Sequence, residues 1–89
     1  MSKSDKSHYI EVDDPRYECQ IHMRRFEGGI AYGAVLRFEG TAVADREYLW
    51  SQFNHRRRGA FSRAKRWLRR AQRHHAEVQA VRDSLKEWL

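Results

Sequence analysis

The chain has 89 residues, a formal net charge of +6 and a sequence pI near 10.0. A chain of this length buries only about 60–65% of its unfolded surface, which excludes a large enzyme with an enclosed substrate cavity and favours one small basic domain. With 40% hydrophobic residues the chain is too apolar to be disordered throughout, and no stretch approaches the roughly 18 apolar residues of a membrane span.

The N-terminal segment, residues 1–7, is small and polar, and predicts a flexible tail ahead of a single domain over residues 8–89. This segment lacks the apolar stretch of a secretory signal, and the single cysteine, Cys19, has no internal partner for a disulfide. We therefore expect a cytoplasmic, intracellular protein that does not associate with membranes.

From His8 to Ala44 the apolar residues follow a period of two, which indicates strands. Two turn signals, Asp13-Asp14-Pro15-Arg16 and Gly28-Gly29, divide this stretch into three segments. A three-stranded antiparallel meander with one buried face follows from this pattern.

The expected register can be written out from the two turns. A first turn centred on Asp14 and Pro15 pairs Ile10 with Cys19 and Val12 with Tyr17. A two-residue loop at Gly28-Gly29 places mostly apolar pairs on the same face. These pairs are Cys19 with Phe38, Ile21 with Leu36, Met23 with Ala34 and Arg25 with Tyr32.

From Asp45 onward the period becomes helical, with Asp45 as an N-cap, and predicts a short helix over about 45–55. The apolar stripe of this helix continues from Ala60 to Leu89. Because Arg57 would interrupt one continuous stripe and Gly59 follows it, we expect a break at 56–59 and a long helix from about residue 60. The predicted fold class is α+β in the order βββαα, with the long basic C-terminal helix packed on one sheet face.

The basic residues are concentrated in one interval of the chain. The 29 residues between Glu47 and Glu77 contain nine Lys and Arg and no acid, so they carry +9, while the rest holds nine Lys and Arg against 12 acids and carries −3. Cations without nearby carboxylates attract anions, and the Arg guanidinium binds phosphate bidentately. We therefore expect a non-catalytic protein that docks on nucleic acid or on an acidic protein or nucleoprotein surface. The residues of this expected surface are Arg56, Arg57, Arg58, Arg63, Lys65, Arg66, Arg69, Arg70 and Arg73.

The sequence contains no pattern typical of helix-turn-helix, zinc-finger, RNP or KH modules, so it predicts no base-specific recognition. An alternative hypothesis is a small inhibitor that acts by protein–protein binding, of the kind that phages and mobile elements encode, including anti-CRISPR proteins. This alternative depends only on the small size, on the lack of catalytic groups and on the lack of any common module.

The long helix is expected to extend beyond the sheet, since 30 helical residues span roughly 45 Å and a ten-residue strand only about 33 Å. Its apolar C-terminal residues then need a second surface. They either fold back on the 45–55 helix after a bend near His74-His75, or form a homodimer interface with a second copy of the chain. The candidate interface residues are Val81, Leu85, Trp88 and Leu89.

Metal and nucleophilic chemistry are not indicated, and we expect no cofactor. Cys19 and His22 lie at an odd spacing, which sends them to opposite faces of a strand. The expected register also places three carboxylates in a row on the exposed sheet face, where Arg side chains, a cation or a basic partner would have to neutralise them. This row consists of Glu11, Glu18 and Glu39.

Overall fold

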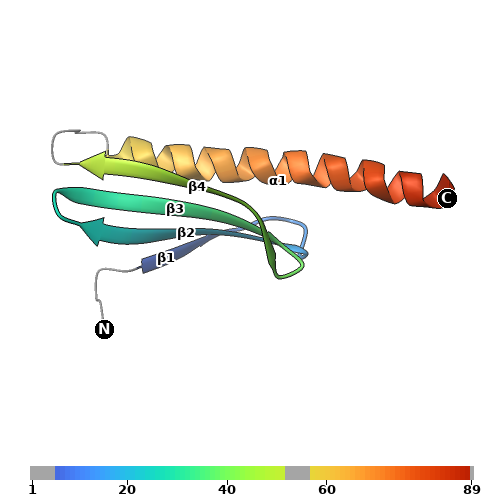
Figure 1. The fold of residues 1–89 in the computed structure, drawn as a ribbon, viewed down its shortest axis with the longest axis horizontal. Helices are drawn as coiled ribbons and strands as arrows, with labels where there is room; N and C mark the ends of the chain where they lie inside the picture. Colours follow the sequence, from blue (N-terminus) through green and yellow to red (C-terminus); the bar gives the residue numbers. More distant parts are fainter. Residues whose placement is uncertain (1–5, 52–56, 89) are drawn as a thin grey trace.

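The computed structural model describes residues 6–51 and 57–88. The described chain is α+β, as expected, and forms an antiparallel sheet with the strand order β1-β2-β3-β4 and a helix along one face (Figure 1). Within residues 6–51 and 57–88, four strands and one helix therefore replace the predicted three strands and two helices. The elements are β1 (Lys6–Ile10), β2 (Tyr17–Phe26), β3 (Gly29–Phe38), β4 (Thr41–Ser51) and α1 (Arg57–Trp88).

The fourth strand corrects the short helix that the sequence predicted over 45–55. Residues 45–51 belong to β4, where Tyr48 pairs with Tyr32 and Trp50 with Ile30 of β3, while residues 52–55 lie outside the described residues. Short apolar runs satisfy both helical and strand periods. Here the strand is favoured because residues 45–51 pair with the open edge of β3. This pairing satisfies the backbone hydrogen-bonding groups and places Tyr48 and Trp50 against the core.

The first turn has the predicted register, with Ile10 opposite Cys19, and β1 also includes Lys6 and Ser7 from the expected tail. The second turn differs: its loop is Glu27-Gly28, Gly28 has a φ of 86°, and Cys19 pairs with Leu36. The register is displaced by two residues from the prediction. A two-residue shift keeps every side chain on its predicted face, so the buried face was correctly assigned.

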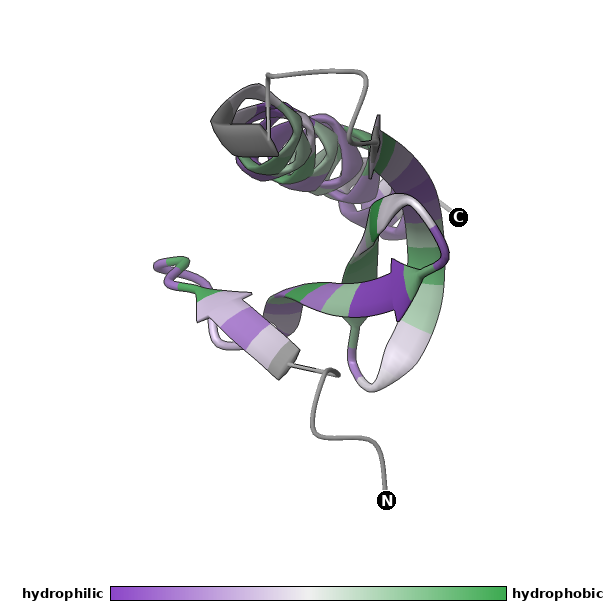
Figure 2. Ribbon diagram, turned by 90° about the vertical axis from the view of Figure 1, so that its left-hand side faces the viewer, coloured by the Kyte–Doolittle hydropathy of each residue, from purple (hydrophilic) through white to green (hydrophobic). Residues whose placement is uncertain are grey.

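The core lies between α1 and the concave face of the curled sheet (Figure 2). On the helix side, Ala60 and Ala64 are small enough to let α1 approach the strands closely, and Leu68 is fully buried beside them. Burial raises the pKa of the Cys19 thiol, which keeps it protonated in this core. The sheet contributes Ile10, Tyr17, Cys19, Ile21, Ile30, Tyr32, Ala34 and Leu36.

The helix α1 begins at Arg57, slightly before its expected start, and continues to Trp88 without the bend predicted near His74-His75. His75 ties α1 to the sheet, since its Nδ1 shares a hydrogen bond of 2.7 Å with the Tyr17 hydroxyl. Burial raises the pKa of Tyr17. The helix then extends past the end of the sheet (Figure 1), so the fold-back on a 45–55 helix is wrong, because neither that helix at 45–51 nor the bend exists.

Candidate functional site

The side of α1 opposite the core carries a continuous set of cations, which we call the basic face. Because Ala60, Ala64 and Leu68 point at the sheet, side chains about 100–260° around the helix from Ala64 point away from it. The cations among these side chains are all exposed except Lys65, which is half-buried, and they span roughly 15 Å along the helix axis. The basic face consists of Arg63, Lys65, Arg66, Arg69, Arg70 and Arg73.

No carboxylate pairs with the basic face in the described part of the chain. The ion pairs among the described residues all lie outside the basic face: Arg16 with Asp14, Arg24 with Glu47 and Arg37 with Glu18. Two members of the basic face lie over aromatic rings instead, with the guanidinium carbon of Arg63 5.7 Å from the ring centre of Tyr48 and Nζ of Lys65 5.7 Å from that of Phe61. These contacts orient the cations and leave their charge unneutralised.

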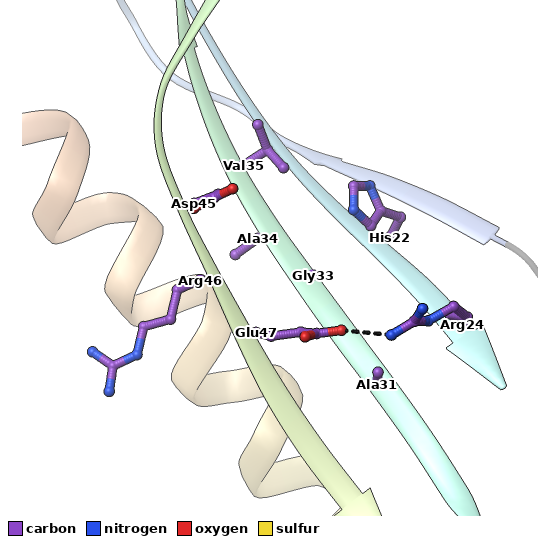
Figure 3. A pocket seen from close by; sticks show the side chains of 9 residues that line it. All are labelled: His22, Arg24, Ala31, Gly33, Ala34, Val35, Asp45, Arg46 and Glu47. Carbon is purple, nitrogen blue, oxygen red and sulfur yellow. Dashed lines mark hydrogen bonds and ion pairs between the residues drawn. The ribbon is translucent and has the colours of Figure 1, made fainter. Parts of the chain in front are cut away.

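The strand β4 adds a cation that the sequence analysis missed. The Arg46 guanidinium lies 5.2 Å from the ring centre of Tyr48, the same ring that Arg63 covers. Figure 3 shows Arg46 pointing toward α1, away from its neighbours Asp45 and Glu47. The period-two alternation of residues 44–50 indicates that Arg46 shares a strand face with Tyr48. The sequence analysis missed this because it assigned these residues to a helix.

A shallow hollow of 230 Å³ lies on the basic face. Its lining residues, Ser62, Lys65, Arg66 and Arg69, come from successive turns of α1, so three cations and one hydroxyl converge on it. Such a group of donors suits the oxygens of a phosphate group, since each cation donates charge-assisted hydrogen bonds.

An acidic loop borders one edge of the basic face. Glu11 and Asp13, between β1 and β2, line a hollow of 580 Å³ together with Arg69 and Arg73. Asp14 in the same loop forms an ion pair with Arg16. Hydrogen bonds from the side chain and the backbone of Arg16 hold the pKa of the Asp14 carboxyl below its usual range. The carboxylates of Glu11 and Asp13 therefore partly offset the positive charge of the two arginines in this hollow.

The remaining predicted residues of the docking surface fall at the start of α1. Arg57 and Arg58 occupy its first turn, which contains no acidic residue, and Arg56 lies outside the described residues. Of the predicted interface residues, Val81, Leu85 and Trp88 are exposed, and Leu89 lies outside the described residues.

The predicted row of carboxylates is wrong. Glu18 faces Arg37 across β2 and β3, with Oε2 and Nη1 3.7 Å apart, because the register differs by two residues from the prediction. Glu39 lies in the β3–β4 turn with a φ of 51°, and Glu11 lies in the loop after β1. The outer sheet face therefore carries paired charges where a glutamate row was expected.

A third hollow, of 510 Å³, lies on the outer face of the sheet (Figure 3). His22, Arg24, Asp45 and Glu47 surround it, and Arg24 is paired with Glu47 at 2.8 Å. The His22 ring crosses Gly33, where a Cβ would lie 2.7 Å from the ring. Arg24 offsets one of the hollow's two carboxylates, and the described residues contain no group of three or more His, Cys, Asp or Glu side chains able to hold a metal ion.

Comparisons with known proteins add no family to this geometry. Scans against protein-family models, curated proteins and solved structures returned no match. The described residues also include no helix with the length and apolarity that a membrane crossing requires.

Proposed function

We propose that this chain is a non-catalytic nucleic-acid-binding protein whose basic face lies against the phosphate backbone of a duplex. The observation that carries the proposal is the set of six cations on one side of α1, for which the described residues provide no carboxylate partner. Cations that are not neutralised within the protein gain most from an external polyanion, because phosphate binding releases condensed counterions.

The residue types on the basic face favour phosphate as the ligand. Five of its six members are Arg, whose planar fork donates two parallel hydrogen bonds to one phosphate group. The hollow lined by Lys65, Arg66 and Arg69 concentrates three of these donors.

A duplex fits this surface better than a single strand. Proteins that bind single strands stack bases on exposed aromatic rings. The rings beside the basic face, Tyr48 and Phe61, are half-buried and covered by Arg63, Arg46 and Lys65. An exposed helix, in contrast, fits the width of a major groove and contacts the phosphates on its sides.

The experiment that tests this proposal measures binding of a labelled random-sequence duplex by fluorescence anisotropy over a range of salt concentrations. Four to six phosphate contacts predict a log–log salt slope of about −4 to −5. A single strand of the same length is expected to bind more weakly. No duplex binding at about 50 mM salt would contradict the proposal and leave the acidic-protein partner as the remaining hypothesis.

A matched pair of variants separates the basic face from net charge. Arg66→Gln with Arg70→Gln is expected to weaken duplex binding and to reduce the magnitude of the slope by about two, one for each arginine that no longer neutralises a phosphate. The control, Arg24→Gln with Arg37→Gln, removes the same charge from the outer sheet face and is expected to leave the slope within about 0.5 of wild type. Equal weakening in both variants would show that overall charge, and not the basic face, governs binding.

A further inference from the structure

The C-terminal part of α1, residues 77–88, extends beyond the sheet (Figure 1). This part carries an exposed apolar stripe. The exposed fractions are 36% for Val78, 59% for Val81, 56% for Leu85 and 87% for Trp88. Large apolar side chains on one side of a protruding helix would be more stable against an apolar surface than in water. This stripe is separate from the basic face and is not used by the proposed function.

The stripe has the period of a helix that packs against another helix. Its positions alternate in steps of four and three residues, an average of 3.5, whereas a helix lying on a sheet follows 3.6. The first positions are covered by the fold, since Trp67 and Ala71 pack against the core, and the later ones are not. The full series is Trp67, Ala71, His74, Val78, Val81, Leu85 and Trp88.

The charges beside the stripe are arranged for a second copy of the same helix. Glu77 flanks the stripe on the side of Val81 and Trp88, and Arg82 flanks it on the side of Val78 and Leu85. In a parallel pair of helices, a residue in the position of Glu77 faces the residue five positions later in the other helix. That residue is Arg82 of the second copy, so the pair forms two opposite-charge contacts.

An antiparallel arrangement brings like charges together. If two antiparallel helices cover the same four seam residues, the midpoint of their contact lies near residue 83, between Val81 and Leu85. In an antiparallel pair, equivalent flanking positions of the two helices face each other, so Arg82 lies beside Arg82 of the second copy. The charge pattern therefore favours the parallel pair.

We propose that residues 77–88 of α1 bind a second copy of this chain as a parallel two-stranded coiled coil, with Val78, Val81, Leu85 and Trp88 in the seam. The seam is only about two heptads long, so the dimer is expected to form at micromolar concentrations and not at nanomolar ones. This inference stands apart from the nucleic-acid proposal, since a monomer can bind duplex and a dimer can form without it.

Sedimentation velocity from about 1 to about 500 µM tests the association. Wild type is expected to shift from monomer to dimer, while Val81→Asp with Leu85→Asp stays monomeric at every concentration. Both substituted side chains are exposed in the monomer, so the circular dichroism melt of the variant at about 1 µM should match that of wild type. A wild type that remains monomeric throughout would overturn the proposal and leave the stripe for another partner.

Charge exchange tests the orientation. Glu77→Arg alone and Arg82→Glu alone are each expected to raise the dimer dissociation constant by about two- to fivefold, and the double exchange is expected to restore it. In the antiparallel pair the double exchange would again bring two like charges together at position 82 and restore nothing. Failure of the double exchange to restore association would therefore exclude the parallel pair.

Cross-linking gives a second measure of orientation. Leu85→Cys places equivalent thiols next to each other in a parallel pair, and mild oxidation should convert most of the dimer to a covalent form. Wild type is the control, because Cys19 is buried and should not cross-link. Cross-linking of Leu85→Cys at the rate of wild type would contradict the parallel seam.

Discussion

The two parts of α1 differ in charge and in what they contact, although they form one unbroken helix. Residues 57–76 carry eight Lys and Arg and no acid, whereas residues 77–88 carry two Lys and Arg and three acids, a charge of +8 against −1. The first part packs on the sheet through Ala60, Ala64 and Leu68, and the second extends past the sheet with Leu85 and Trp88 exposed.

This contrast in charge and packing follows from how much of α1 the sheet covers. The sheet covers the apolar side of residues 57–76, so the opposite side is free to concentrate cations that would repel one another on an isolated helix. Residues 77–88 have no sheet beside them, and their apolar side is left for another helix. We infer that the first part serves an anionic partner and the second part serves self-association.

The largest expected effect is on the free energy of unfolding, which substitutions in the two parts of α1 should change to different extents. Leu68→Ala removes a fully buried side chain and is expected to lower the free energy of unfolding by about 2–5 kcal/mol. Leu85→Ala removes an exposed one and is expected to change it by less than about 0.5 kcal/mol in the monomer. Urea unfolding at about 1 µM, followed by circular dichroism, measures both. Equal decreases would mean that residues 77–88 are packed on the domain.

A smaller effect is expected from the acidic loop beside the basic face. Glu11→Gln with Asp13→Asn removes two carboxylates that share a hollow with Arg69 and Arg73, and should strengthen duplex binding by about two- to fivefold at low salt. Asp45→Asn with Glu47→Gln makes the same charge change on the outer face and is the control (Figure 3). Anisotropy titration compares the two, and an equal gain in both would show that the loop has no local influence on the basic face.

The sequence predicted much of the fold because burial has a regular period. The alternation of β2 and β3 identified the buried face, and it tolerated an error of two residues in the register. The position of the turn between β2 and β3 could not be predicted from the glycines alone, since both Gly28 and Gly29 suit a loop. The register is determined by strand pairing over ten residues.

The fourth strand was not predictable from local pattern. Residues 45–50 satisfy a helical and a strand period, and the deciding interaction is with β3, whose edge the sequence does not reveal. That error hid Arg46. The basic face itself was predicted, because a helical stripe of core residues fixes where the other side chains point, independent of the helix's exact start.

The most direct test of the contrast within α1 is an NMR titration of ¹⁵N-labelled protein with a random duplex, observed at the arginine Nε–Hε groups. We expect the signals of Arg63, Arg66 and Arg70 to shift or broaden first, and that of Arg82 to stay unchanged at equal duplex concentration. Movement of Arg82, or of Arg24 and Arg37 on the outer sheet face, without movement of the basic face would contradict this account.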